Sequence, residues 1–265
     1  MPLTPSRTVD ELRELRELTG DENGAQRVAW TDTWERARAW LRGKLEGLPL
    51  EYERDEAGNQ WWTLRGESDR AVLIGGHIDS VPNGGWLDGA MNVLGGVEVL
   101  RRIAEEGTPP VTVRLVDWAD EEGARFGRSL FGSSAASGTM SDQEEIRNRV
   151  DADGVRWEDA LREHDVDLDR VLDAHRQLES AAAYLELHIE QGPVLESLDL
   201  PVGAVIGTFG VERWQITWRG QAAHAGSTAS RPARSAATVA HGQSRGIAPP
   251  RTSARAARWR IHRWE

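Results

Sequence analysis

The sequence predicts an α/β protein whose central sheet is mostly parallel and flanked by helices. Short apolar stretches, such as AVLIGG at residues 71–76 and VTVRLV at 111–116, are typical of buried strands. Amphipathic stretches with apolar residues at helical spacing alternate with these strands along the chain. Strands that alternate with helices favour a largely parallel sheet with helices on its faces.

Each helix and strand is predicted from the spacing of its apolar residues, which is helical or alternating, and from the turn residues that bound it. Leucine, alanine and tryptophan side chains recur at helical spacing in the first two helices, and residues 51–65 alternate around a turn at Gly58, as in a hairpin. The segment 141–180 is polar with helical character. In chain order, the predicted helices are 8–19, 31–46 and 93–105. The predicted strands outside the hairpin are 71–76, 111–116, 184–190, 202–206 and 214–218.

The composition excludes several classes of protein. The chain has 265 residues, a net charge of −11 and no cysteine, so a disulfide framework and a thiolate metal site are excluded. No stretch approaches the roughly 18–20 uncharged apolar residues of a membrane span, and the N-terminus lacks the apolar region of a secretory signal. We therefore expect a cytoplasmic protein with neither membrane nor nucleic-acid partners.

The last 37 residues differ from the rest of the chain. Residues 229–265 contain eight arginines and one glutamate, a net charge of +7, whereas residues 1–228 carry −18. This tail is rich in Ala, Arg, Ser and Pro and shows neither helical nor strand periodicity. By composition it is predicted to be disordered or to be out-of-frame sequence.

Candidate chemistry begins at the carboxyl end of the strand AVLIGG. His77 and Asp79 are two residues apart, so both can project from the same face of the chain. Asp88 follows in a glycine-rich loop that can fold back tightly. Ligands collect at the carboxyl ends of strands in open α/β sheets.

Further polar residues follow two other predicted strands. Glu121 and Glu122 come just after the strand at 111–116, and His188 lies on the predicted strand 184–190. Imidazole and carboxylate groups suit Zn²⁺, Mn²⁺ or Co²⁺ better than Ca²⁺. Each signal alone is more often structural: a paired Glu is usually a solvated face, and a lone His is usually a satisfied core or surface residue. Their shared position at strand ends favours a metal site.

Four motif blocks together resemble one enzyme family. They are GGHIDSVPNGGWLDGAMNVLGGVEVL, DEEGARFGRSLFGSSAASG, LELHIEQGPVLE and WRGQAAHAGST, which stand in that order. The blocks resemble the M20-type metallohydrolases, in the branch of N-carbamoyl-L-amino-acid hydrolases, β-ureidopropionases and allantoate amidohydrolases. The resemblance covers roughly residues 8–228 and implies a zinc-exopeptidase-like catalytic domain followed by a smaller α+β lid, or dimerisation, domain.

The resemblance also implies a role for each matching residue. Two divalent ions (Zn²⁺, Mn²⁺ or Co²⁺) are implied, and Asp79 is implied to orient the first histidine. Glu121 is implied to be the general base that activates water, and Gln191 to contact the substrate. His224 is implied to contact the substrate and to stabilise the oxyanion, often in the partner subunit of a homodimer. The implied metal ligands are His77, Asp88, Glu122 and His188.

The implied reaction is hydrolysis of a C–N bond in a linear ureido or amide compound. Candidate substrates are N-carbamoyl-L-amino acids, β-ureidopropionate and allantoate. The block HIEQGP favours this branch over an M20 aminoacylase or peptidase, which remains an alternative. A substrate panel separates the two.

The sequence departs from the family pattern after Thr228. The family's later blocks, including the last histidine of the second metal site, have no counterpart, so that site is expected to be incomplete. The chain is therefore expected to contain an incomplete catalytic domain at 1–207, the start of a lid at 208–228 and a basic tail at 229–265. We hypothesise that the tail is a frameshift product. An inactive truncated fragment is the alternative to a working enzyme.

Overall fold

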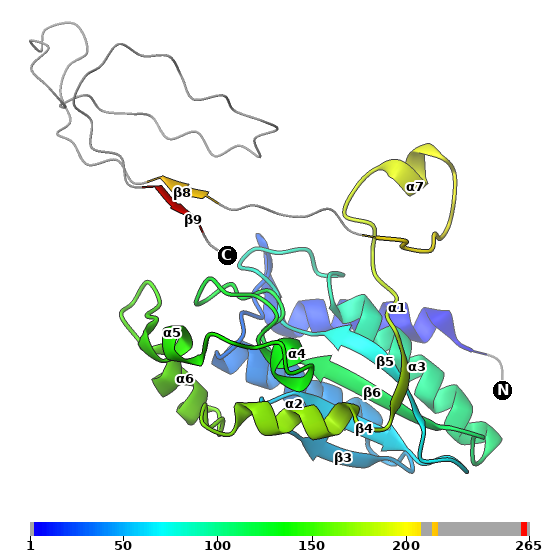
Figure 1. Cartoon of the computed structure of the whole chain (residues 1–265). Coiled ribbons are helices and arrows are strands. Elements are labelled where there is room, and N and C mark those ends of the chain that lie inside the picture. The colour runs from blue at the N-terminus through cyan, green and yellow to red at the C-terminus, as the bar shows by residue number, and fades with distance from the viewer. Residues whose placement is uncertain (1–2, 208–213, 217–260, 264–265) are drawn as a thin grey trace, which may run out of the picture. The chain divides into compact units, whose positions relative to one another are not determined.

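The computed structural model describes residues 3–207, 214–216 and 261–263, and all statements below refer to these residues. The chain divides into two units, Met1–Val194 and Leu195–Glu265. The first unit contains the central sheet and its helices (Figure 1). In the second unit, β8 (Trp214–Ile216) pairs antiparallel with β9 (Ile261–Arg263).

The central sheet has five strands in the order β3-β4-β6-β5-β7. Pairing is antiparallel between β3 and β4 and between β4 and β6, and parallel between β6 and β5 and between β5 and β7, so only β4 runs against the others. This confirms the predicted α/β fold and the predicted hairpin. The strand bounds are β3 (Glu51–Arg54), β4 (Gln60–Leu64), β5 (Ala71–His77), β6 (Thr112–Trp118) and β7 (Ala181–Leu185).

Helices cover both faces of the sheet. In Figure 1, α1, α2 and α3 lie on one face, and α4 and the 3-10 helix η1 lie on the other. The predicted helices at 8–19, 31–46 and 93–105 are confirmed as α1, α2 and α3. The helix bounds are α1 (Pro5–Thr19), α2 (Asp32–Leu45), α3 (Ala90–Glu106), α4 (Phe131–Ala136), α5 (Gln143–Asn148), α6 (Trp157–Glu163), η1 (Val171–Leu178) and α7 (Val194–Ser197). A short hairpin of β1 (Gly20–Asp21) and β2 (Gly24–Ala25) follows α1.

The core forms where the apolar stripes of the helices meet the two central strands. Every residue of β6 is buried, whereas every residue of β7 is exposed. The centre of the sheet is thus covered on both faces, as expected for strands inside an α/β layer. In the part of the chain that the structure describes, no helix is long and apolar enough to cross a membrane.

Two strand predictions were wrong. The strand predicted at 184–190 starts earlier and ends at Leu185, because its pairing with β5 stops there. His188 therefore follows β7 instead of lying on it. Residues 202–206 form no strand, although Val202–Ile206 was predicted to be one. The strand predicted at 214–218 is confirmed for 214–216, and its last two residues lie outside the described residues.

Candidate metal and catalytic site

The candidate site begins at the carboxyl ends of β5 and β6. His77 is the last residue of β5, and Glu121 lies three residues after β6 ends at Trp118. Because β5 and β6 are parallel neighbours, both ends meet at the same edge of the sheet. His77 Nε2 lies 3.6 Å from Glu121 Oε2. The sequence-based expectation that these side chains converge is met.

Asp79 lies between these two strand ends and contacts residues from both. Its carboxylate accepts hydrogen bonds from the backbone N–H of Glu121 at 3.2 Å and of Glu122 at 3.1 Å. His77 Nδ1 lies 3.1 Å from the Asp79 carbonyl oxygen and 3.4 Å from Asp79 Oδ1. A neutral imidazole bonded through Nδ1 presents the lone pair of Nε2 outward, as metal binding requires.

Gly89 allows the loop that carries Asp88 to pass close to His77. Gly89 has φ +64°, and a Cβ built there would lie 2.4 Å from His77 Cε1. Any other residue would therefore collide with the imidazole ring or push the loop away. The glycine-rich loop predicted from the sequence places Asp88 near the strand end for this steric reason.

His188 and Gln191 approach Asp88 from the segment after β7. His188 Nε2 lies 3.7 Å from Asp88 Oδ1. Gln191 Nε2 donates a hydrogen bond to Asp88 Oδ2 at 2.5 Å. Gln191 was predicted to contact substrate, and in this structure its amide contacts the Asp88 carboxylate. His224, predicted to stabilise the oxyanion, lies outside the described residues.

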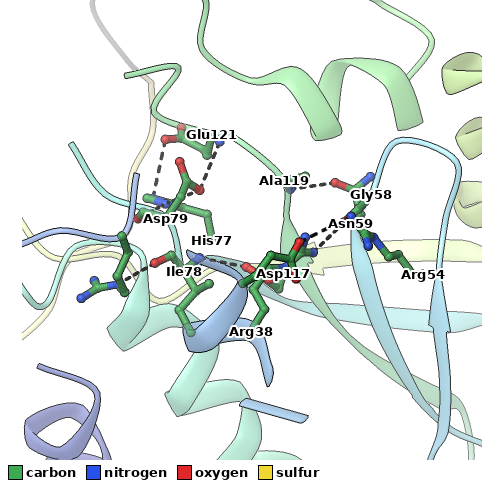
Figure 2. A network of polar contacts seen from close by, with 12 residues as sticks. Arg38, Arg54, Gly58, Asn59, His77, Ile78, Asp79, Asp117, Ala119 and Glu121 are labelled. Atoms are coloured by element: carbon green, nitrogen blue, oxygen red, sulfur yellow. Dashed lines mark hydrogen bonds and ion pairs between the residues drawn. The ribbon is translucent and has the colours of Figure 1, made fainter. Parts of the chain in front are cut away.

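A buried charged network fixes the strand end from behind. Asp117 Oδ1 accepts from Ile78 N at 2.8 Å, and Asp117 Oδ2 accepts from Arg38 Nε at 2.8 Å (Figure 2). Both side chains of the Arg38–Asp117 pair are fully buried. Arg27 Nε donates to the Ile78 carbonyl at 2.7 Å. Buried charged groups therefore hold both backbone polar groups of Ile78, the residue between His77 and Asp79.

The loop after β6 is also held in place. Asp120 has a positive φ of 54°, a conformation that costs energy for a residue other than glycine. The Trp30 indole donates to Asp120 Oδ2 at 2.6 Å, and Phe131 N donates to the Asp120 carbonyl at 3.1 Å. Ala119 N donates to Asn59 Oδ1 at 2.9 Å, as Figure 2 shows. These contacts stabilise the turn that presents Glu121.

Sequence reasoning missed these supporting residues. Asp117 carried a signal, because it is a charged residue inside the apolar strand VTVRLVDW. Arg27 and Arg38 are two of many arginines, and nothing in the sequence pattern distinguishes them. The sequence also held a signal for Glu186, because this carboxylate lies two residues before the candidate metal ligand His188 in YLELHIE.

Burial and the several neighbouring carboxylates shift the pKa values of the groups in the site. Burial opposes the charged form of His77, but the hydrogen bond to Asp79 and the neighbouring carboxylates outweigh it and raise the His77 pKa to about 10. Burial raises the pKa values of Glu121 and Glu122, and the charge of His77 opposes this rise. A cation bound here would change this balance, because its charge is the largest in such a site.

The imidazole and carboxylate groups of the site are ligand types that suit a divalent transition metal ion. Two ligands of one tetrahedral ion, each bonded at about 2.1 Å, lie roughly 3.4 Å apart. The His188–Asp88 separation of 3.7 Å is close to that value, and the His77–Glu121 separation of 3.6 Å places the candidate base beside the candidate ligand His77. Within the described residues, no three His, Asp or Glu side chains come together closely enough to hold an ion. Among the described residues, the structure thus shows one pair of candidate ligands, one ligand–base pair and no complete ligand set.

An open cavity adjoins Glu121. Its volume is about 550 Å³, and its wall includes the aromatic rings of Trp118 and Tyr184 and the carboxylates of Glu121 and Glu186. Hydroxyl groups from α4 and the turn after it, including Ser133, complete the polar part of the wall. The candidate base therefore borders a space large enough for a small molecule.

Comparison with known proteins identifies the family to which the chain is similar. Residues 73–259 match the model of the peptidase family M20/M25/M40, a range that extends beyond Thr228, where the motif resemblance ends. An N-carbamoyl-L-amino acid amidohydrolase of Geobacillus stearothermophilus is 40% identical over 82% of this chain and 54% of that protein. An allantoate amidohydrolase of Bacillus subtilis is 33% identical over 78% of this chain and 50% of that protein.

Solved structures give the same result. The crystal structure of an amidase of the hydantoinase/carbamoylase family from Burkholderia phymatum matches with a TM-score of 0.67 and 31% identity, over 88% of this chain and 56% of that one. The chain spans about half the length of the curated relatives it matches. The family model covers well over half of the sequence and includes every candidate site residue that the sequence predicted. The chain therefore belongs to the peptidase family M20/M25/M40.

Proposed function

We propose that this chain carries the metal-binding half of a hydrolase that cleaves C–N bonds in linear ureido or amide compounds. The substrates we propose are N-carbamoyl-L-amino acids, β-ureidopropionate or allantoate. The observation that carries the proposal is the meeting of two His–carboxylate pairs, His77–Glu121 and His188–Asp88, at one edge of the sheet. The names of the relatives, N-carbamoyl-L-amino acid amidohydrolase and allantoate amidohydrolase, support the substrate class.

The residues would hold the metal as follows. His77, Asp88 and His188 supply the donors for one ion, and Asp88 and Glu122 supply donors for a second. Zn²⁺, Mn²⁺ and Co²⁺ all suit this mixture of imidazole and carboxylate. A divalent ion, when bound, lowers the pKa of water and polarises a carbonyl group. The second set has only carboxylates among the described residues, so we expect it to bind more weakly.

Glu121 is the proposed general base. Its carboxylate borders the open cavity and faces His77, so it can take a proton from water near the metal donors and return it to the leaving nitrogen. Burial raises its pKa toward the range in which a carboxylate exchanges protons efficiently. Asp79 holds the backbone at Glu121 and so fixes the position of this base. We propose His224 as the group that stabilises the oxyanion, and a homodimer as the assembly that brings it into place.

A specific observation favours a second candidate, an inactive fragment of such an enzyme. The described residues contain no complete three-ligand group. In that case the chain would bind one ion and turn over no substrate. An aminoacylase or peptidase of the same family is the third candidate.

The test combines metal binding with a substrate panel. Co²⁺ is titrated into the chain, ammonia release is measured from N-carbamoyl-L-amino acids, β-ureidopropionate and allantoate, and release of free amino acids is measured from N-acetyl amino acids and dipeptides. Bound Co²⁺ with turnover of the ureido compounds, lost in Glu121→Gln but with Co²⁺ retained, is the expected result. Bound Co²⁺ without any turnover supports the fragment, and preference for dipeptides supports a peptidase. Absence of metal binding would overturn the proposal.

A further inference from the structure

The backbone pairing of β7 stops before it reaches the candidate site. β5 pairs with β7 only from Ala71 to Ile74, and the pairing on β7 ends at Leu185. His77, at the end of β5, lies three residues beyond the last paired position. The segment 186–191, which carries His188, therefore follows the end of the ladder. Side-chain contacts join this segment to the sheet and to α3.

Glu186 provides such contacts with both of its carboxylate oxygens. Oε1 accepts a hydrogen bond from Asn92 Nδ2 at 2.7 Å, and Oε2 accepts one from the Tyr184 hydroxyl at 2.6 Å. Asn92 is buried on α3, the helix that packs against β5. Glu186 thus connects the segment after β7 to a helix that packs against β5.

The connection continues to β6 through Tyr184. The Tyr184 hydroxyl accepts a hydrogen bond from Trp118 Nε1 at 3.1 Å, and the two rings meet edge to face with centroids 6.1 Å apart. Burial and the hydrogen bond to Glu186 raise the pKa of Tyr184, so its hydroxyl remains a donor. Trp118 is the last residue of β6, three residues before Glu121. One chain of hydrogen bonds therefore links β6, the end of β7 and α3.

The backbone of β5 leaves room for this arrangement. A Cβ at Gly76 would lie 2.7 Å from Asn92 Cβ and 3.1 Å from Glu186 Oε1. Only a residue without a side chain at this position lets α3 and Glu186 approach the strand so closely. The close approach occurs one residue before His77.

We propose that Glu186 is a positioning residue that holds His188 beside Asp88. Asn92 and Tyr184 donate to the two Glu186 oxygens, so these contacts fix the side chain that precedes His188 by two residues. Two residues further along the chain, His188 Nε2 lies 3.7 Å from Asp88 Oδ1, and Gln191 donates to the same carboxylate. This inference rests on the metal site of the proposed function.

The first test measures Co²⁺ affinity by isothermal titration and visible absorption. Glu186→Ala should weaken binding by about 10–100-fold, the usual effect of removing a group that orients a ligand. Glu186→Gln should restore most of the affinity, because it keeps an acceptor for Asn92 and a polar group beside Tyr184. Glu179→Ala, which removes an exposed carboxylate just before β7 begins, is the matched control and should leave the affinity unchanged. Equal affinity in Glu186→Ala and the wild type would overturn the proposal.

A double-mutant cycle separates positioning from a general loss of stability. If Glu186 acts through His188, Glu186→Ala should cause no further loss of Co²⁺ affinity in a His188→Ala background. Independent, additive losses would overturn the proposal, because they would mean that Glu186 acts elsewhere.

Hydrogen–deuterium exchange of the metal-free protein gives a readout that does not depend on metal binding. Glu186→Ala should speed exchange in residues 186–191 and leave residues 71–80 unchanged. If the wild-type chain binds no Co²⁺, the proposed function fails and the exchange result alone decides the positioning proposal. Faster exchange in residues 186–191 would support it, and an unchanged rate would overturn it.

Discussion

The two halves of the candidate site are held in different ways. On the β5–β6 side, His77 and Asp79 are 3% and 0% exposed, and hydrogen bonds from several elements fix the strand end. On the β7 side, the His188 side chain is 40% exposed and follows an edge strand whose residues are all exposed. The difference indicates that buried hydrogen bonds from several strands and helices order one half of the site, whereas a few side-chain contacts order the other half.

Apolar side chains gather on the exposed side. Tyr184, Leu185 and Leu187 are 41%, 62% and 54% exposed, although large apolar residues clustered along a strand are usually covered. The β5–β6 side, by contrast, has a fully buried β6. We therefore expect substitutions on the β5–β6 side to change stability. Substitutions on the β7 side should change ligand binding with little effect on stability.

The largest expected effect is on the buried Arg38–Asp117 pair. Arg38→Met removes the partner of a fully buried carboxylate and should lower the free energy of unfolding by about 3–5 kcal/mol. Arg65→Met removes an exposed pair with Glu51 and should cost about 0–1 kcal/mol. Urea denaturation followed by tryptophan fluorescence measures both. Equal losses in the two variants would refute the contrast between buried and exposed networks.

The second prediction concerns the turn between β3 and β4. Burial raises the pKa of Asp55 to about 6, although hydrogen bonds from Asn59 and Trp61 oppose the rise. The folded state then holds a proton that the unfolded state, with a pKa near 3.8, releases, so this group's contribution to stability falls as pH rises between about 4 and 6. The loss approaches about 3 kcal/mol above pH 6, because a tenfold change in proton affinity corresponds to about 1.4 kcal/mol.

Asp55→Asn isolates this contribution. The variant keeps only one of the two oxygens that accept from Ala57, Asn59 and Trp61, so its absolute stability is not informative. The slope of unfolding free energy against pH, measured by urea denaturation from pH 4 to 7, should lack the decline that Asp55 causes in the wild type. Parallel slopes in the two proteins would contradict the raised pKa.

The third prediction compares the two histidines. His77→Ala and His188→Ala should each weaken Co²⁺ binding by at least about 100-fold, because removing a ligand costs more than removing a group that orients one. Only His77→Ala should also lower the unfolding free energy, since His77 is buried and His188 is 40% exposed. Titration with Co²⁺ and urea denaturation of the metal-free proteins test the two parts. Equal destabilisation by both substitutions would contradict the difference between the halves.

This contrast also explains how much the sequence could predict. Periodicity located the helices and central strands, because their burial determines which positions are apolar. The motif residues at the ends of β5 and β6 came together as expected, since parallel strands end at one edge. The end of β7 was predicted incorrectly, because alternation in YLELHIE continues past the last residue that pairs with β5. The sequence pattern also could not identify Arg38 as the partner of Asp117, since the two are 79 residues apart.

The smallest effect is expected at Gly89, where the two halves meet. Gly89→Ala requires an unfavourable positive φ and places a methyl group 2.4 Å from His77 Cε1, so it should cost about 1–3 kcal/mol of stability and weaken Co²⁺ binding. Gly138 has a similar φ of +70°, and a Cβ there would meet nothing within 4 Å. Gly138→Ala should therefore show the backbone cost alone and leave Co²⁺ affinity unchanged. If both variants bind Co²⁺ as the wild type does, close contact between the Asp88 loop and His77 is not needed to form the site.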